Sequence, residues 1–266
     1  MCGLLKCIST VAALLLEHPL QIETAQVSLL GDREDNQDRV GIFKSDHAAL
    51  LIVLDGMGGH SDGSRAAETA LKSIGDAFNR QTHPLFDPLG FLHMVLSRAH
   101  DDVVNLGSDQ AVDSRPRATC AMCLVQDGNA FTAHIGDSRV YHIRQHAIVQ
   151  RTRDHSHVEL LLREGKITEA EIQGHPMRNF VECCLGGDPS IPEMTISGRK
   201  ILQPGDLLLL CSDGVWCNLK DDDVSGFSRD QASLQTALEA LGKKATTASS
   251  PYSDNTSAVS LRWSAA

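Results

Sequence analysis

The sequence Ala-Ala-Leu-Leu-Ile-Val-Leu-Asp-Gly-Met-Gly-Gly-His occupies positions 48–60 and is the best starting point for predicting the architecture. Its first seven residues are all apolar, which predicts a strand buried on both faces. Asp55 and Gly56 follow directly, so the strand places a carboxylate at the rim of a sheet, in a fixed position with open faces. More glycines come next, and Ser64 can cap a helix predicted for residues 65–79 from its apolar spacing.

The same arrangement, a buried apolar strand that ends in an aspartate, occurs at two further places. Ala-His-Ile-Gly precedes Asp137, and Leu-Leu-Leu-Leu-Cys-Ser precedes Asp213. A fourth aspartate, Asp254, stands just before the last predicted strand. One strand followed by Asp-Gly is usually only a turn, but several converging carboxylates repel each other unless cations bind. Oxygen ligands of this kind select hard ions such as Mg²⁺ or Mn²⁺.

Predicted strands come in adjacent groups and predicted long helices come in pairs, which favours an α+β fold over an alternating parallel one. Residues 25–30 and 39–43 are interpreted as a strand pair around a polar stretch. Asp-Gly-Asn at 127–129 is a hairpin signal between strands at 118–125 and 129–135. The other predicted elements are a helix at 88–106, strands at 138–144, 193–199, 206–211 and 256–263, a helix at 230–241 and a loop at 242–255.

The length of 266 residues corresponds to one large domain or two small ones. Residues 1–19 contain a short apolar stretch that is below the roughly 20 residues of a membrane span and lacks a signal-peptide cleavage site. We therefore expect 1–19 to be an N-terminal extension and 20–266 to form the folded domain. Within it, residues 153–190 carry two short predicted helices between Gly and Pro residues, and we expect them to form an inserted flap.

Composition and charge exclude several classes of protein. Apolar residues make up 42% of the chain, which is too many for a disordered protein. Lys plus Arg is 24 and Asp plus Glu is 34, so the formal charge is 24 − 34 = −10, which argues against nucleic acid and anionic membranes as partners. An acidic substrate remains compatible with this charge, because a bound metal ion can supply positive charge. The eight scattered cysteines indicate reduced thiols and a cytoplasmic location.

Cys120 and Cys123 have the spacing of a zinc site. On a strand, however, two side chains three positions apart point to opposite faces. The sequence has no second Cys or His pair with matching spacing, so we predict no zinc site.

Together, the aspartates and their neighbours give the sequence a family resemblance. It resembles the metal-dependent protein phosphatases of the protein phosphatase 2C type, in their compact bacterial form. Each motif is weak alone, but the ordered set is highly specific: Arg33-x-x-Asn36-Gln37-Asp38, Asp55-Gly56-Met57-Gly58-Gly59-His60, Gly136-Asp137-Ser138-Arg139, Asp154-His155-Ser156, Ser212-Asp213-Gly214 and Asp254-Asn255. The resemblance implies a four-layer α-β-β-α sandwich with two central, mainly antiparallel sheets, a flap subdomain, and a metal centre between sheet edges.

The resemblance also implies a set of metal ligands. Asp55 would bridge two Mn²⁺ or Mg²⁺ ions, and Gly56 would offer its carbonyl oxygen to one of them. Asp213 and Asp254 would hold the other ion. Asp137, together with Asp213, would contribute to a third, weaker site.

Three further roles follow from the resemblance. Asp38 matches a carboxylate that orients the attacking water, and Arg33 matches the arginine that binds phosphate through its planar fork. His60 is the candidate acid near the leaving group. Three departures accompany these matches. Gln37 stands where many relatives carry Glu, and Met57 replaces the histidine of eukaryotic members. Arg117-Ala118-Thr119 stands where the family usually has glycine and threonine before the central strand.

The resemblance implies hydrolysis of phosphoserine and phosphothreonine in proteins by a hydroxide held between two metal ions, opposing a Ser/Thr kinase in signalling. The partners are then phosphorylated proteins, without nucleic acid or a membrane span, and the chain is expected to be a monomer. One alternative is a binding module that holds phosphoproteins without hydrolysis, against which the presence of Asp55, Asp213 and Asp254 argues. Another is a different metal phosphoesterase that acts on nucleotides or small phosphates, but aromatic residues are only 4% and the sequence shows no base-stacking cluster or basic groove.

Overall fold

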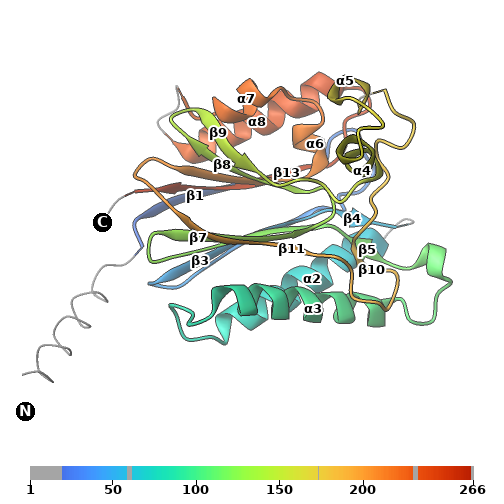
Figure 1. The fold of residues 1–266 in the computed structure, drawn as a ribbon, viewed down its shortest axis with the longest axis horizontal. Coiled ribbons are helices and arrows are strands. Elements are labelled where there is room, and N and C mark those ends of the chain that lie inside the picture. Colours follow the sequence, from blue (N-terminus) through green and yellow to red (C-terminus); the bar gives the residue numbers. More distant parts are fainter. Residues whose placement is uncertain (1–19, 59–61, 173, 230–232, 265–266) are drawn as a thin grey trace, which may run out of the picture.

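Two five-stranded antiparallel sheets lie face to face in the computed structural model, which describes residues 20–58, 62–172, 174–229 and 233–264 (Figure 1). The first sheet has the order β1 (Ile22–Leu29), β13 (Thr256–Trp263), β12 (Leu207–Cys211), β8 (Arg139–Arg144) and β9 (Ala147–Arg151). The second has the order β11 (Thr195–Ile201), β7 (Asn129–Ile135), β6 (Cys120–Gln126), β3 (Ala48–Leu54) and β2 (Arg39–Lys44). A small third sheet joins β10 (Leu185–Gly186), β5 (Arg117–Ala118) and β4 (Gly56–Met57).

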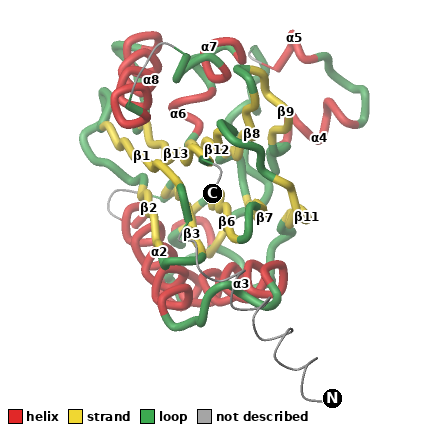
Figure 2. Tube along the Cα trace, turned by 90° about the vertical axis from the view of Figure 1, so that its left-hand side faces the viewer, coloured by secondary structure: helices red, strands yellow, loops and turns green. Residues whose placement is uncertain are grey.

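Helices cover the outer faces of both large sheets, as the side view shows (Figure 2). Two helices pack on the second sheet, namely α2 (Asp62–Asn79) and α3 (Pro88–Leu106). Three pack on the first sheet, namely α6 (Asp213–Trp216), α7 (Asp221–Ser225) and α8 (Leu234–Ser249). The other helices are short: η1 (Val112–Ser114), α4 (His157–Arg163) and α5 (Glu169–Ile172). The predicted four-layer α-β-β-α sandwich is therefore confirmed.

Strand β3 forms the centre of the packing, as its apolar run predicts. All seven of its residues are buried. Leu50 faces helices α2 and α3, while Leu51 faces the opposite sheet. The side chains of Cys120 and Cys123 are divided in the same way between the two interiors, so these thiols point to opposite faces of β6, as expected.

Local signals predict several elements accurately. Helix α3 begins at Pro88, and the side chain of Asp87 accepts a hydrogen bond from Gly90 N. The predicted hairpin also forms, because Gln126 pairs with Asn129 across a two-residue turn. The turn residues Asp127 and Gly128 both have positive φ, as a type I′ turn requires.

The predicted pairing of residues 25–30 with 39–43 is wrong. Strand β1 pairs with β13, whereas β2 pairs with β3 in the other sheet. The polar residues between them cross from one sheet to the other, and backbone hydrogen bonds such as Asp32 N to Ser253 O (3.0 Å) fix that crossing. The sheet to which β1 belongs is decided by its pairing with β13, more than 200 residues later in the chain. Neither segment carries a local sequence signal for this pairing.

The predicted loop at 242–255 is also wrong over its first half, because helix α8 continues to Ser249. Gly242 lies where a side chain would come within 3.3–3.6 Å of Leu29 and Val27, so a small residue lets the helix pack closely on β1. Ala245 is likewise buried, and the Thr and Lys residues that suggested a loop occupy the solvent side.

The segment between β9 and β11 lies at one end of the sandwich (Figure 1). It contains α4 and α5, and its two arms are joined by His157 N to Phe180 O (3.0 Å) and Glu182 N to His155 O (2.8 Å). The predicted N-terminal extension, residues 1–19, lies outside the described residues. Among the described helices, none combines the length and apolar character that crossing a bilayer requires.

Replacing Leu51 by Ala should lower the free energy of unfolding by about 2–5 kcal/mol, because the fully buried side chain would leave a cavity between the sheets. Urea unfolding followed by circular dichroism measures this loss. Val149→Ala is the control, since Val149 on β9 is 53% exposed, and it should cost less than about 1 kcal/mol. Equal losses for the two variants would contradict the described packing.

Candidate active site

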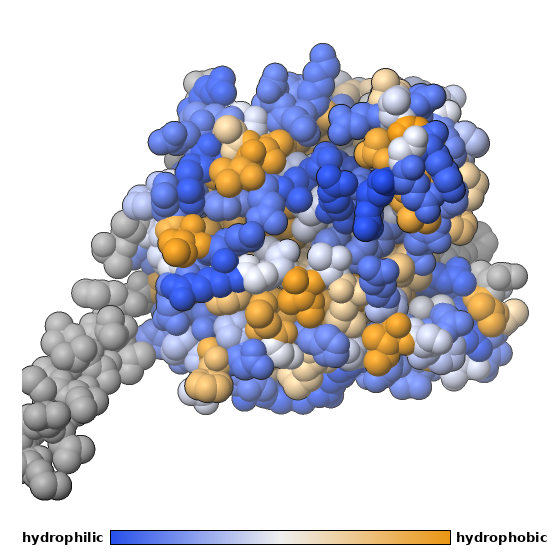
Figure 3. Space-filling view, in the orientation of Figure 1, coloured by the Kyte–Doolittle hydropathy of each residue, from blue (hydrophilic) through white to orange (hydrophobic). Residues whose placement is uncertain are grey.

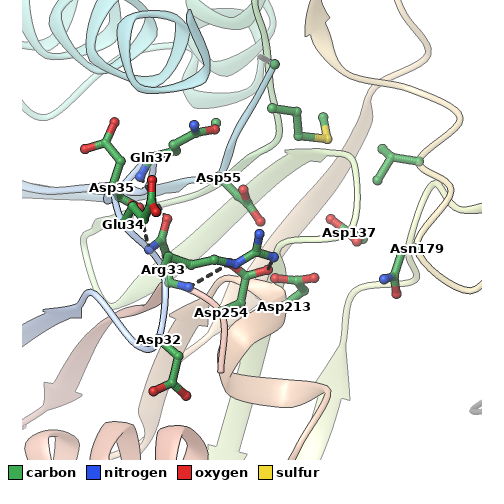
Figure 4. A pocket seen from close by; sticks show the side chains of 15 residues that line it. Asp32, Arg33, Glu34, Asp35, Gln37, Asp55, Asp137, Asn179, Asp213 and Asp254 are labelled. Carbon is green, nitrogen blue, oxygen red and sulfur yellow. Dashed lines mark hydrogen bonds and ion pairs between the residues drawn. The ribbon is translucent and has the colours of Figure 1, made fainter. Parts of the chain in front are cut away.

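Strands of both sheets deliver aspartates to one pocket. Asp55 follows β3, Asp137 follows β7, and Asp213 follows β12. Asp254 precedes β13. These four side chains line a pocket with a volume of about 610 Å³ and approach one another within it (Figure 4). The strand-end aspartates singled out in the sequence thus line one pocket, together with Arg33 and Gly56.

Thr119 connects the loops that carry Asp55 and Asp137. Its backbone N–H donates to Asp55 O (2.8 Å), and its hydroxyl accepts from Asp55 N (3.2 Å). The same hydroxyl lies 2.7 Å from Ser138 Oγ, next to Asp137. Because Thr119 is completely buried, these bonds hold the two loops at a fixed separation.

Asp38 lies behind the pocket and is only 3% exposed. Its carboxylate accepts a hydrogen bond from Ser212 Oγ (2.8 Å), and Ser212 in turn precedes Asp213. Burial raises the pKa of Asp38 to about 7; hydrogen bonds from Ser257 and Ser212 oppose the rise, and the charge on Asp213 adds to it.

Arg33 lies across the pocket and contacts Asp254 (Figure 4). Its Nη2 donates to Asp254 Oδ2 at 2.7 Å, and the two side chains are 59% and 38% exposed. Arg33 is the one cationic residue among the described residues that line the pocket. An exposed ion pair of this kind contributes little to stability, so the guanidinium can exchange its partner at small cost.

Asn255 fixes the loop that carries Arg33. Its Nδ2 donates to Leu30 O (2.9 Å) and Asp35 O (3.0 Å), while its Oδ1 accepts from Gln37 N (2.8 Å). Asn255 is 6% exposed, so the three bonds are shielded from water. The motif Asp254-Asn255 therefore combines a pocket carboxylate with the residue that positions the opposite rim.

Position 56 needs glycine because the backbone of Gly63 and of Gln37 comes too close for a side chain there. A Cβ at this position would lie 2.2 Å from Gly63 O and 2.7 Å from Gln37 O. The side-chain oxygen of Gln37 lies where a Cβ on Gly63 would be, at 2.3 Å. Gln37 therefore packs on the start of α2, beside the pocket that its neighbours line.

The pocket carboxylates are poorly compensated. Burial raises the pKa of Asp55 and of Asp137 well above the ordinary value, and neighbouring carboxylates, Asp213 among them, raise both further. Burial also raises the pKa of Asp213 to about 6, with the charge on Asp254 as the next cause. A hydrogen bond from the Asp55 side chain opposes this rise in the pKa of Asp213. Clustered carboxylates that hold protons near neutral pH are the environment that a divalent cation would neutralise.

The donor set fits Mg²⁺ or Mn²⁺, both of which prefer carboxylate, carbonyl and water oxygens. Over the described part of the chain, no three His, Cys, Asp or Glu side chains are gathered closely enough to hold an ion by themselves. Mg²⁺ usually keeps several waters and takes only one or two carboxylates from the protein. An open site with widely spaced carboxylates therefore suits this ion.

The motifs Gly136–Arg139 and Asp154–Ser156 meet beside Asp137. Arg139 forms two hydrogen bonds with Asp154, at 2.8 and 2.7 Å, and its guanidinium lies 3.3 Å from the ring centre of Trp216. Trp216 Nε1 donates to Asp137 O at 3.0 Å. This buried network positions the Asp137 loop, and Trp216 was not among the residues singled out from the sequence.

Two further residues that line the pocket, Asn179 and Val181, were not singled out from the sequence. Both lie in the segment predicted as a flap. Nothing in their local pattern shows that they reach a pocket whose aspartates lie both before and after them in the chain. Met57 lines the pocket at the position noted as a departure from eukaryotic relatives. His60, the predicted acid, lies outside the described residues.

An acidic pocket with an arginine at its mouth, at the edge of an α-β-β-α sandwich, is the arrangement expected of a metal-dependent phosphatase. The chain belongs to the protein phosphatase 2C family, since the family model described as Protein phosphatase 2C matches residues 26–249. Protein phosphatase PhpP of Streptococcus pneumoniae is 32% identical over 223 residues, covering 81% of this chain and 89% of the relative.

Solved structures agree with this family. The Streptococcus agalactiae serine/threonine phosphatase superposes with a TM-score of 0.84 at 25% identity, covering 91% of this chain and 99% of that one. The catalytic domain of serine threonine protein phosphatase PstP, solved with two manganese ions, gives a TM-score of 0.77 at 24% identity and covers 92% of this chain and 99% of its own. The second likeness shows a shared fold.

Metal-free protein should lose stability as the pH rises from 5 to 8. The folded protein keeps protons on Asp213 and Asp38 up to pKa values of about 6 and about 7, whereas the unfolded chain releases them near 3.8. Stability from these protonated carboxyls is therefore full below about pH 4 and disappears as the pH passes their folded pKa values, a loss of roughly 3–4 kcal/mol for each carboxyl at about 1.4 kcal/mol per pKa unit. Urea unfolding in chelator measures it.

Asp213→Asn should reduce this loss, because it removes one of the repelling charges. Asp76→Asn is the control, since Asp76 pairs with Lys72 on the surface of α2, and it should keep the wild-type pH dependence. A wild-type stability that is constant or rises between pH 5 and 8 would contradict the description of the pocket.

Proposed function

We propose that this chain is a metal-dependent protein phosphatase that hydrolyses phosphoserine and phosphothreonine in proteins. The observation that carries the proposal is the convergence of Asp55, Asp137, Asp213 and Asp254 in one pocket with Arg33 at its mouth. Membership of the protein phosphatase 2C family supports the same activity, as do relatives named as protein phosphatases.

The proposed cofactor is Mn²⁺ or Mg²⁺, with two ions in the main site. Asp55 and the Gly56 carbonyl would hold one ion, with Asp55 shared, and Asp213 and Asp254 would hold the other. Asp137 would serve a third, weaker site. When bound, the ions activate a water as the nucleophile and offset the charge of the phosphate.

Arg33 is proposed to bind the phosphate group. Its guanidinium is 59% exposed at the mouth of the pocket and contacts one oxygen of Asp254. A phosphate carries more charge than a carboxylate and matches the planar fork of arginine in two hydrogen bonds. A phosphorylated side chain that enters the pocket would therefore draw Arg33 away from Asp254. Arg33 would then hold the phosphate group so that its phosphorus is in line for attack.

Asp38 is proposed to orient the attacking water and to take part in its deprotonation. With a pKa of about 7, this buried carboxyl can hold or release a proton near neutral pH. Ser212 fixes its orientation through a 2.8 Å hydrogen bond. His60 remains the proposed donor of a proton to the departing serine or threonine oxygen.

The proposed partners are phosphorylated proteins and the Ser/Thr kinase that modifies them, and we propose a cytoplasmic monomer. The flap, residues 153–190, would shape access to the pocket because Asn179 and Val181 line it. Nucleotides are disfavoured as substrates, since no aromatic side chain occurs among the described residues that line the pocket, and bases need such a surface for stacking.

Purified protein should release phosphate from a phosphothreonine peptide with Mn²⁺ and should not do so in excess chelator. Asp213→Asn should lower kcat/KM at least about 100-fold, because a fixed charge at the reaction centre is lost. Asp76→Asn, on the surface of α2, is the matched control. Malachite green detection of phosphate measures the turnover. Turnover that is independent of metal, or unchanged in Asp213→Asn, would contradict the proposal.

A further inference from the structure

A second groove opens directly from the catalytic pocket. It has a volume of about 710 Å³ and shares Met57, Gly58, Asn179 and Val181 with that pocket. A peptide whose phosphorylated residue occupies the catalytic pocket can therefore continue directly into this adjoining groove. An extended chain advances about 3.3 Å per residue, so a side chain about three residues from the phosphorylated one reaches roughly 10 Å along this groove.

The walls of the groove are apolar and open to solvent. Val112, Phe180 and Ile191 line it and are 51%, 48% and 61% exposed, respectively. Elsewhere on the face seen in Figure 3, apolar residues reach the surface as separate patches among hydrophilic ones. Exposed large apolar side chains gathered around one concave surface are a feature of binding sites.

Phe180 is exposed but held in place. Its carbonyl accepts a hydrogen bond from His157 N (3.0 Å), and its N–H donates to Met177 O (3.0 Å). The rings of His157 and Phe180 also pack edge to face, with ring centres 6.2 Å apart at 85°. A side chain that is already ordered loses little conformational entropy when it binds a partner.

The charged residues of the groove already have partners within the chain. Arg117 Nη2 donates to Val112 O (2.8 Å), and Asp188 Oδ1 accepts from Ser190 N (2.7 Å). Glu182 Oε1 lies 2.8 Å from His157 Nδ1. These hydrogen bonds hold the charged groups in place, and the exposed side chains of Val112, Phe180 and Ile191 offer a contact surface for an apolar side chain.

The opposite rim of the catalytic pocket is acidic. Asp32, Glu34 and Asp35 lie on the side away from Asn179, and all three are exposed (Figure 4). An extended substrate therefore meets carboxylates on one side of its phosphorylated residue and apolar walls on the other. The two sides impose different requirements on the residues that flank the phosphate.

We propose that this groove binds the substrate segment next to the phosphorylated residue and selects a bulky apolar side chain about three residues away, on one side only. The inference rests on the proposed phosphatase function and adds a substrate class to it. The occupant is an extended segment of a phosphoprotein with Leu, Met or Phe at that position.

The test compares phosphothreonine peptides that carry Leu or Ser about three residues before or after the phosphate. Para-nitrophenyl phosphate, which fills the catalytic pocket alone, is measured in parallel. Wild-type protein should favour one Leu peptide over its Ser counterpart about tenfold in kcat/KM, mostly through KM. Phe180→Ser and Ile191→Ser should each remove most of this preference and lower the ratio of peptide to aryl phosphate kcat/KM.

Phe86→Ser is the matched control, because Phe86 is a fully exposed aromatic residue in the loop before α3 and outside the groove. It should keep the wild-type preference and ratio. Thermal unfolding of every variant verifies folding. An unchanged Leu preference in both groove variants, or no preference in wild-type protein that hydrolyses all peptides, would overturn the inference.

Fluorescence anisotropy with labelled phosphopeptides separates this inference from the proposed function. If the protein binds the Leu peptide about tenfold more tightly than the Ser peptide but releases no phosphate with any metal, the phosphatase proposal fails and the groove stands. If phosphate is released but the Leu and Ser peptides bind equally, the groove inference fails and the phosphatase proposal stands.

Discussion

Repulsion among five aspartate carboxylates at one edge of the sandwich is the constraint on which the rest of the structure depends. Asp38 and Asp137 are less than 10% exposed, and burial together with neighbouring charges raises the pKa of each. A fold selected only for stability would not collect these charges, because removing them from water is costly. Their presence indicates a cation that offsets the charge, and the surrounding network of hydrogen bonds keeps the site assembled before that cation binds.

That network connects the two sheets. Thr119 ties the Asp55 loop to the Asp137 loop, and Ser212 ties Asp38 to the strand that precedes Asp213. Asn255 holds the rim loop that carries Arg33. Because each of these side chains is buried, the positions of the carboxylates follow from the packing of the sandwich, and substrate access is left to the segments at its edge.

The sequence predicts the elements whose signals are local. Strand β3 is continuous apolar sequence, and helix α3 carries Asp87, Pro88 and Gly107 at its ends, so both were predictable. Sheet membership of β1 and β2 was not, because the partner of β1 is β13, more than 200 residues away. The convergence of the four strand-end aspartates was expected from family resemblance, since spacing alone cannot show that side chains meet. A flap at 153–190 was expected from the sequence, but which of its residues reach the pocket was not, because only the folded chain brings Asn179 and Val181 there.

Calorimetric titration of metal-free protein with Mn²⁺ at pH 6, in two buffers with different ionisation enthalpies, tests the central claim most directly. If burial and repulsion keep protons on Asp38, Asp55 and Asp213, then metal binding must displace them, so each chain should release about one to two protons as the main site fills. The total release should be smaller at pH 8.5, because Asp213 and Asp38, whose pKa values lie at about 6 and about 7, have already lost their protons there. Mn²⁺ binding without proton release at pH 6, or no binding at all, would contradict the account.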